Sequence, residues 1–519
     1  MRGRRISFPD WSLPMKRMCF LCFLATAAAI LPIAAARAEV TEAAPGVYFR
    51  IGDIDRGQSN GGYVICDSFV AAIDAPNAEA SAEMLAEVAE LTGKPVKYLV
   101  ITHGHWDHDR GMDVFAQAGV VVIAHEQLRQ RYAQQKKEGT FIGVSDRLTL
   151  GEGGRRIEIF THGTAHSPTD LFAYVPDEGV LFTGDAVVST TSSWFGDSNV
   201  ENWIQTCRKL AALDAKVVCP GHGPMGGPEL IPAFSDYLVK LRDEVAYQVS
   251  MGRSIEMTVQ KVDVPEQAAF CREGGFPDHV KAVYGQLTAA PAIDGPRAQP
   301  RALVLIGDRY HPPAYIRPPL EKVFERLGMP AVFVYDVTKL SADSLRNVSL
   351  LVVLRDGMVW PDDDKNARWW MSAQQVEALD EFVSGGRGYL ALHNSTALQR
   401  LGPEATAYRD LLGSSYNGHG AGDERFAVRV VEPDHPVTRG VTGFDAVDER
   451  HRPVMHADDA IILLEAGPAG QAAVNGYVRQ VGGGRVCHLA NGHNREVLEN
   501  AQMQKLLENA MLWCCGLER

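Results

Sequence analysis

The stretch LVITHGHWDHDRG, residues 99–111, joins an apolar, β-branched run to a dense group of metal-binding residue types. The apolar run predicts a buried strand, and the polar residues follow directly at its end. Alternate side chains of an extended segment point the same way, so His103 and His105 can reach one metal ion while Asp107 and His108 turn toward a second. Imidazole and carboxylate ligands without a thiolate suit zinc best, with iron and manganese as alternatives.

Three later segments supply the partners that such a site requires. His166 lies in GTAHSPTDL, Asp185 in GVLFTGD and His222 in VVCPGHG, each at the end of a strand-like run. The expected ligand set is therefore His103, His105, Asp107, His108, His166, Asp185 and His222. A carboxylate such as Asp185 can bridge two cations, which is how two-metal sites make hydroxide available at neutral pH. The alternative is scattered polar turns, but five of the seven histidines before residue 250 fall in these four segments.

The surrounding pattern predicts two α/β domains in a chain of 519 residues, which is too long for one ordinary core. Short strands and an amphipathic helix over 78–92 alternate up to about residue 285. A fresh strand, helix and strand rhythm begins at RALVLIG, with a helix expected over 318–328, and predicts a parallel, flavodoxin-like sheet. We predict a leader at 1–38, a first domain at 39–286, an Ala- and Pro-rich linker at 287–300 and a second domain at 301–519.

The N-terminus predicts export, and the overall charge predicts no nucleic-acid partner. Lys16 and Arg17 precede an apolar run that ends at Ala36-Arg37-Ala38, small residues of the kind that signal peptidase reads. Cleavage after Ala38 would leave a periplasmic or secreted protein without a membrane partner, whereas an uncleaved leader would anchor the chain in a membrane. The formal net charge of -13 disfavours phosphate backbones as a ligand.

The series THGHWDH, AHSPTD, FTGD and PGHG resembles the metallo-β-lactamase superfamily over about residues 46–285. The resemblance implies a four-layer αββα sandwich with two zinc ions at one edge of its sheets. It implies that the first zinc is held by one triad and the second by another, with Asp185 bridging them. The first triad is His103, His105 and His166, and the second is Asp107, His108 and His222. The implied reaction is metal-dependent hydrolysis, with Asp107 as the catalytic residue that steers or takes up a proton.

The same resemblance narrows the substrate. True β-lactamases of the superfamily generally lack an aspartate at the position of Asp185, whereas thioesterases of the glyoxalase II type and lactonases have one. Asp74 matches an aspartate that the family keeps near the site, where it would support a ligand. Trp194 and Phe195 either wall the pocket or pack in the core. His125 and His162 fall on no ligand motif, so we expect neither to bind metal.

From Arg301 onward the chain resembles the ThuA-like, or trehalose-utilisation, branch of the amidotransferase-like fold. The resemblance rests on FVSGGRGYLALH, GSSYNGHG, EPDHPVTRGV, FDAVDE, GGGRVCHLANGH and NAMLWCCG. Where an amidotransferase needs a cysteine nucleophile, LALHNST has His393 and no thiol, which disfavours glutaminase chemistry.

Polar residues at the predicted strand ends of this second domain form a candidate ligand site. They are His393, His419, His435, Asp448, Glu449 and His493. Ligands of open α/β sheets bind at the carboxyl ends of strands, so these residues suit a sugar-like ligand or an additional metal. The alternative is that they only stabilise turns.

The sequence therefore predicts an exported, dinuclear zinc hydrolase of a small ester, thioester, lactone or amide, with a ThuA-like domain for ligand binding. Its partner would be a small-molecule substrate, and the oligomeric state is left open. A flavodiiron-like oxidoreductase has a related domain layout, but those proteins use glutamate at the position of His105 and a hydroxyl-rich phosphate loop where this chain has IGDRYHPPAY. A third alternative is a non-catalytic exported binding protein.

Overall fold

The computed structural model describes residues 38–191, 193–291, 299–362, 364–397, 403–468 and 472–518. The predicted leader lies outside these residues except for Ala38, and residues 292–298 of the predicted linker lie outside them as well. The described residues from Glu39 onward form one structural unit. Across the described part of the chain, no helix combines the length and the apolar character needed to cross a membrane.

Two mixed sheets make up the N-terminal half. The first has seven strands in chain order, antiparallel from β1 to β4 and parallel from β4 to β7. These are β1 (Val40–Ala44), β2 (Val47–Arg50), β3 (Gly61–Ile65), β4 (Val70–Ile73), β5 (Val96–Val100), β6 (Val121–His125) and β7 (Thr140–Val144). The second sheet has the order β12-β11-β10-β9-β8, in which only β11 and β12 are parallel. Its strands are β8 (Arg147–Glu152), β9 (Arg155–Phe160), β10 (Phe172–Val175), β11 (Val180–Gly184) and β12 (Val217–Pro220).

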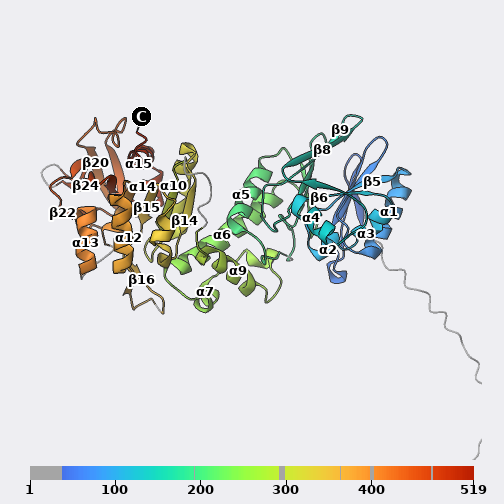
Figure 1. Ribbon diagram of the computed structural model, residues 1–519, viewed down its shortest axis with the longest axis horizontal. Coiled ribbons are helices and arrows are strands. Elements are labelled where there is room, and N and C mark those ends of the chain that lie inside the picture. Colours follow the sequence, from blue (N-terminus) through green and yellow to red (C-terminus); the bar gives the residue numbers. More distant parts are fainter. Residues whose placement is uncertain are drawn as a thin grey trace, which may run out of the picture. The chain divides into compact units, whose positions relative to one another are not determined.

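The buried side chains show four layers. Val64 and Ile73 of the first sheet share a core with Ile159 and Phe182 of the second, so the sheets face each other. The helices α1, α3 and α4 cover the outer face of the first sheet, and α5 and α6 cover the outer face of the second (Figure 1). Their bounds are α1 (Ala78–Thr92), α3 (Met112–Gln117), α4 (Glu126–Gln134), α5 (Val200–Ala211) and α6 (Leu230–Ser250). This arrangement is the predicted αββα sandwich.

Further helices complete the N-terminal half. They are α2 (Trp106–Asp109), α7 (Ile255–Lys261), α8 (Gln267–Phe270) and α9 (Phe276–Thr288), together with the 3-10 turn η1 (Ile54–Arg56). The last of these helices, α9, reaches two residues into the stretch that the sequence predicts as a linker. The predicted helix over 78–92 agrees with α1. The side chain of Asn77 caps the N-terminus of this helix, and Gly93 terminates it in a left-handed conformation.

The C-terminal half is built on a nine-stranded sheet with the order β14-β13-β15-β18-β25-β24-β23-β20-β21. The first five strands are parallel and the remaining four extend the sheet antiparallel. They are β13 (Ala302–Ile306), β14 (Ala331–Val334), β15 (Leu350–Leu354), β18 (Gly388–Leu392), β20 (Glu424–Val430), β21 (Phe444–Asp448), β23 (Ile461–Ala466), β24 (Ala473–Val481) and β25 (Gly484–Leu489). Two small ribbons pair β16 (Met358–Val359) with β17 (Arg368–Trp369), and β19 (Ser414–His419) with β22 (His451–Met455).

Helices cover both faces of this sheet, as the sequence predicts for a parallel core. Val304 of β13 packs with Leu320 and Leu507 on one face, while its neighbour Leu303 packs with Leu379 on the other, because successive side chains of a strand alternate between faces. The helices are α10 (Pro313–Leu327), α11 (Ala342–Leu345), α12 (Ala373–Ser384), α13 (Pro403–Leu412), α14 (Arg495–Glu499) and α15 (Ala501–Cys514), with the 3-10 turns η2 (Val337–Lys339) and η3 (His393–Ala397).

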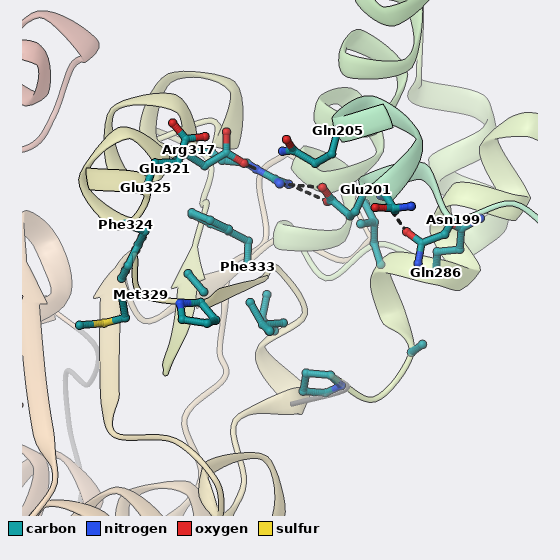
Figure 2. A pocket seen from close by; sticks show the side chains of 18 of the residues that line it. Asn199, Glu201, Gln205, Gln286, Arg317, Glu321, Phe324, Glu325, Met329 and Phe333 are labelled. Atoms are coloured by element: carbon teal, nitrogen blue, oxygen red, sulfur yellow. Dashed lines mark hydrogen bonds and ion pairs between the residues drawn. The ribbon is translucent and has the colours of Figure 1, made fainter. Parts of the chain in front are cut away.

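Helix α10 begins five residues earlier than the predicted start at 318. A proline suits the first turn of a helix, because the N–H it lacks would have no partner there, and Pro313 occupies this place. The extra turn brings Arg317 into the helix, where its buried guanidinium donates two hydrogen bonds of 2.6 Å to Glu201 of α5 (Figure 2). The same side chain reaches Tyr335 at 2.7 Å and Glu321 at 2.6 Å. A cavity of about 820 Å³ opens beside this network.

We expect Arg317→Gln to lower the stability of the folded chain by about 2–4 kcal/mol, because it removes the nearest buried counter-charge of Glu201 and Glu321. The two glutamates keep only the more distant pairs with Arg242 at 3.6 Å and Arg208 at 3.9 Å among the described residues. The measurement is the urea midpoint followed by circular dichroism. The matched control is Arg326→Gln in the same helix, whose exposed ion pair with Glu508 is worth less than about 1 kcal/mol. Equal urea midpoints for the two variants would contradict the stabilising role assigned to the buried ion pairs of Arg317.

Candidate metal centre

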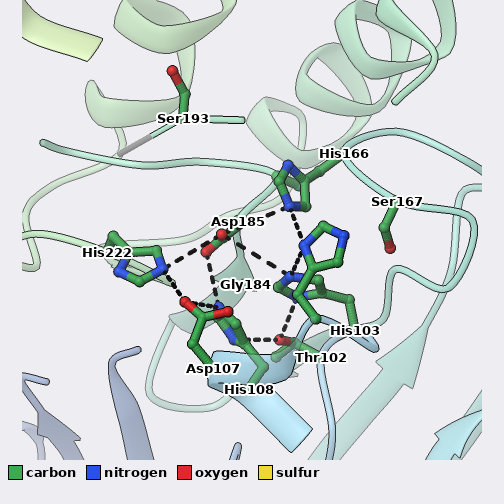
Figure 3. Close-up of polar contacts among 12 residues, drawn as sticks. Thr102, His103, Asp107, His108, His166, Ser167, Gly184, Asp185, Ser193 and His222 are labelled. Carbon is green, nitrogen blue, oxygen red and sulfur yellow. Dashed lines mark hydrogen bonds and ion pairs between the residues drawn. The ribbon is translucent and has the colours of Figure 1, made fainter. Parts of the chain in front are cut away.

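The ends of several strands bring the predicted metal ligands to one edge of the two sheets. His103 follows β5, and the single turn of α2 then redirects Asp107 and His108. His166 lies in the loop between β9 and β10, Asp185 directly follows β11, and His222 follows β12. All seven predicted side chains converge, six of them labelled in Figure 3.

Three histidines form the first triad, as the resemblance implied. His105 Nδ1 lies 3.0 Å from His103 Nε2 and 3.0 Å from His166 Nε2. His103 and His166 are buried, whereas the side chain of His105 is 20% exposed. The three nitrogens therefore surround one point that opens to solvent on the side of His105.

The second triad combines one carboxylate with two imidazoles. Asp107 Oδ2 lies 3.0 Å from His222 Nε2 and 3.9 Å from His108 Nε2. His108 is fully buried, and Asp107 is the more exposed of the two aspartates in the cluster. This triad is therefore also accessible from one side.

Asp185 lies between the two triads. Its Oδ1 is 3.2 Å from His108 Nε2, and its Oδ2 is 3.6 Å from His166 Nε2 and 3.5 Å from His222 Nε2. The two oxygens thus face nitrogens of both triads, which is the placement that a bridging carboxylate needs.

A buried carboxylate behind the second triad fixes the orientation of His108. Asp74 accepts hydrogen bonds from His108 Nδ1 at 2.8 Å, from the hydroxyl of Thr102 at 2.8 Å and from the backbone N–H of Thr102 at 2.7 Å. Because a carboxylate only accepts, Nδ1 of His108 carries the proton and Nε2 faces Asp185. Asp74 has a φ of 58°, a left-handed conformation that aspartate and asparagine tolerate better than most residues.

Two supporting residues were missed by the sequence reasoning. Asp170 accepts hydrogen bonds from the backbone N–H of Ala165 and Ser167, which flank His166, and it follows that histidine in the motif AHSPTD. Asn60 donates to the carbonyl groups of Pro220 and Gly223 on either side of His222. The first could have been found from its motif, but nothing near Asn60 in the sequence indicates the contact.

Burial and charge set the protonation of the cluster. Burial lowers the pKa of His166 to about 3 and that of His103 well below its usual value, so both rings are neutral at pH 7. Burial alone would raise the pKa of Asp185, but the imidazoles of His222 and His108 hold it well below the usual range. Burial opposes the charging of His108, yet Asp185 and Asp74 raise its pKa well above the ordinary value.

The residues fit divalent metal ions. His108 Nε2 and Asp185 Oδ1 are buried and have no hydrogen-bond partner among the described residues, although they lie 3.2 Å apart. Buried polar atoms without partners are costly, and an ion between them would satisfy both. A donor set of five imidazoles and two carboxylates, without a thiolate, suits zinc.

The two aromatic residues in the loop after Asp185, Trp194 and Phe195, lie in different surroundings. The ring of Trp194 is 51% exposed and lies edge-on to His105 with 4.9 Å between centroids, so it flanks the open side of the cluster. Phe195 is buried against Trp203 and His279, which is ordinary core packing. Asp197, not singled out from the sequence, places Oδ1 3.3 Å from His105 Nε2.

The histidines expected not to bind metal lie outside both triads. His125 caps α4 by accepting from the backbone N–H of Gln127 at 3.3 Å. The ring of His162 packs beside Phe160 and Phe172. Neither belongs to a group of converging ligand atoms among the residues that the structure describes.

The structure regroups the candidate residues of the second domain. His393, Glu449 and His493 converge, and they are joined by His311. The sequence reasoning missed His311, although it lies in IGDRYHPPAY, after β13 of the nine-stranded sheet. His419 contacts Glu449 from outside the group at 2.8 Å. The carboxylate of Asp448 is fully buried and accepts hydrogen bonds from the loop that carries His493, through the backbone N–H groups of Gly492 and His493 and the side chain of Asn491. His435 lies elsewhere, beside Trp513.

We expect Asp74→Asn to weaken zinc binding at the second triad by about 10–100-fold, because the amide no longer holds His108 in its ligand orientation while the left-handed backbone is kept. Competition with a chromophoric chelator measures the affinity. Asp113→Asn, at an exposed ion pair with Lys137, is the control and should leave it unchanged. Unaltered affinity in Asp74→Asn would refute this role.

Comparison with known proteins agrees with the two halves of the fold. Residues 57–222 match the metallo-beta-lactamase superfamily, and residues 301–514 match the trehalose utilisation family, ThuA. The chain is 28% identical over 179 residues to a metallo-beta-lactamase type 2 of Bacteroides fragilis, covering 33% of this chain and 72% of that protein. It is 23% identical over 265 residues to a linear primary-alkylsulfatase of a Pseudomonas species, covering 40% of this chain and 49% of that protein.

A solved metallo-beta-lactamase from Pontibacter korlensis superposes with a TM-score of 0.36 at 26% identity, covering 39% of this chain and 99% of that one. The chain spans about half the length of the alkylsulfatase it matches. The family matches confirm the predicted fusion and the prediction of an enzyme of the metallo-β-lactamase superfamily. The chain therefore joins an N-terminal hydrolase-type domain of the metallo-β-lactamase superfamily to a C-terminal ThuA domain.

Proposed function

We propose that this chain is an exported, dinuclear zinc-dependent hydrolase of a small ester, thioester, lactone or amide, and that its ThuA domain binds a ligand such as a carbohydrate. The observation that carries the hydrolase proposal is the position of Asp185. Its two oxygens lie 3.2–3.6 Å from nitrogens of both triads.

The shared carboxylate favours two ions over one structural ion. Structural zinc sites are closed tetrahedra of four ligands around a single ion. This cluster instead offers two sets of three ligand atoms, and Asp185 faces both. His105 and Asp107 leave the cluster open to solvent on one side, so a water or substrate oxygen could reach an ion held by either set, as catalytic zinc requires.

The side chains around the cluster indicate where a substrate would enter and which group could handle a proton. Bound zinc would supply Lewis acidity and bring the pKa of water close to neutrality. His105 and Asp107 form the exposed side of the cluster, so the substrate enters there. Asp107 is the carboxylate nearer to solvent, which suits it to steer an incoming water or to pass a proton from the reacting group.

The surroundings of the open side favour a small substrate with an apolar part. The exposed indole of Trp194 offers an apolar surface beside His105. Asp185 favours thioester or lactone substrates over β-lactams, given the resemblance noted above. The alkylsulfatase among the relatives adds alkyl sulfates to the substrates worth testing.

The flavodiiron alternative is disfavoured by two side chains. His105 supplies an imidazole nitrogen to the first triad, where an iron site of that class would have a carboxylate. In the second domain, the loop after β13 carries the buried Asp308. Burial alone would raise the pKa of this carboxyl, but its contact with His311, the charge of Arg355 and a hydrogen bond from Asn394 hold it below the usual range. A buried anion at that place would repel a flavin phosphate.

We expect His105→Ala to reduce hydrolysis of the best substrate by roughly a hundredfold or more, since it removes a ligand of the first triad. The zinc-loaded protein is tested on thioester, lactone, β-lactam, phosphodiester and alkyl sulfate substrates, with kcat/KM as the readout. The zinc content is measured on the same samples and should fall by about one ion per chain.

His162→Ala is the matched control, since this histidine lies in the same domain but outside both triads. It should keep both the activity and the zinc content of the unaltered protein. Retained activity in His105→Ala would overturn the assignment. Fewer than two zinc ions per chain with no hydrolysis of any substrate would favour a non-catalytic binding protein.

For export, we expect the mature chain to begin at Glu39 and to contain 481 residues. Intact mass of the protein recovered from the periplasm or medium of a bacterial host measures this. Ala38→Arg should block cleavage, because signal peptidase reads a small residue there, and should leave the uncleaved chain in the membrane fraction. An uncleaved, membrane-bound form of the unaltered protein would instead indicate an anchor.

A further inference from the structure

A second group of converging ligand atoms lies in the ThuA domain, far along the chain from the hydrolase cluster. It consists of His311, His393, Glu449 and His493, whose ligand atoms all lie within 4.8 Å of one another. These residues follow β13, β18, β21 and β25, and β13, β18 and β25 belong to the parallel part of the sheet. They therefore occupy the edge where parallel sheets bind ligands.

Outer hydrogen bonds turn two of these rings toward a common point. His311 Nδ1 donates to the carboxylate of Asp308 at 2.8 Å, and His393 Nδ1 donates to the carbonyl of Ala490 at 2.9 Å. Both acceptors require a proton on Nδ1, so Nε2 of each neutral ring carries a lone pair. This is the arrangement by which metal-binding histidines are fixed in one tautomer.

The lone pair of His393 faces an anion. Its Nε2 is fully buried and has no hydrogen-bond partner among the described residues. It lies 3.4 Å from Glu449 Oε2, and two lone pairs at this distance repel unless a cation lies between them. His311 Nε2 likewise lies 3.1 Å from His493 Nδ1, which in turn is 3.5 Å from Glu449 Oε2.

These spacings suit tetrahedral zinc. Ligand atoms about 2.0–2.1 Å from zinc in a tetrahedron are separated from one another by about 3.3–3.4 Å. The three separations of 3.1, 3.4 and 3.5 Å lie close to this value. Three imidazoles and one carboxylate also form a donor set that zinc accepts.

The backbone and neighbouring side chains hold the group in place. His393 has a φ of 47°, a left-handed conformation that costs energy for a residue with a side chain and that is kept at functional sites. Asp448 accepts from the backbone N–H of His493 at 3.0 Å and so fixes the loop that carries it. Nε2 of His451 lies 3.0 Å from Glu449 Oε2, which orients the carboxylate.

We propose that the ThuA domain holds one zinc ion through His311, His393, Glu449 and His493. This site is separate from the hydrolase centre and does not depend on the hydrolase proposal. A hydrogen-bonded cluster without metal is the competing description, in which a proton on His393 takes the place of the ion.

The test counts zinc in the full-length protein by mass spectrometry after equilibration with buffered zinc and removal of loosely bound metal. The unaltered protein should hold about one zinc ion more per chain than His493→Ala. His493 is chosen because it is only half-buried, so its loss is tolerated more easily than that of His393. Glu449→Gln is the second variant, and it keeps the size of the side chain while it weakens the ligand.

His456→Ala is the matched control, since His456 is exposed in the same domain and contacts Ser415 rather than the cluster. It should keep the full zinc content. Replacing zinc by cobalt should give a visible absorption difference between the unaltered protein and His493→Ala that reports tetrahedral coordination. Equal metal content in the unaltered protein and in both variants would overturn the proposal. This result can be distinguished from a failure of the proposed metal site in the hydrolase domain, which would instead leave the zinc content unchanged in His105→Ala.

Discussion

The buried carboxylate of Asp185 is the constraint on which the N-terminal half depends. An isolated anion in this position would carry a large desolvation cost, and the imidazoles of His108, His166 and His222 around it offset that cost. Those rings come from separate loops, so the two sheets must bring their strand ends to one edge. Asp74 behind His108 and Asp170 beside His166 show that further buried carboxylates hold the loops in place.

The two halves of the chain share one structural device. In each, a residue with a side chain adopts a left-handed conformation immediately after a buried strand: Asp74 after β4 and His393 after β18. Such a turn stops the strand abruptly and directs the side chain into the edge of the sheet. The strained conformation is maintained because the surrounding hydrogen bonds hold each residue in place.

The buried Arg317 links the two halves of the chain through its ion pair with Glu201.

Much of the hydrolase cluster was predictable because its ligands are encoded locally. Each lies at the end of an apolar run, and His103 and His105 follow the alternation of an extended segment. The alternation of strands and helices was predictable from hydrophobic periodicity, whereas the four layers were expected only from the resemblance to the metallo-β-lactamase superfamily. Asn60 and His311 were not predictable, because their contacts join segments that only the sheets place side by side.

The sequence alone determined the two domains, the seven candidate ligands of the first centre and the lack of a nucleophilic cysteine near His393. The tertiary structure decided which of the two loop aromatics, Trp194 or Phe195, faces the open side, because side-chain exposure depends on packing between distant helices. It also decided that His311 joins His393, Glu449 and His493, because parallel pairing of β13, β15 and β18 brings the ends of non-consecutive strands to one edge.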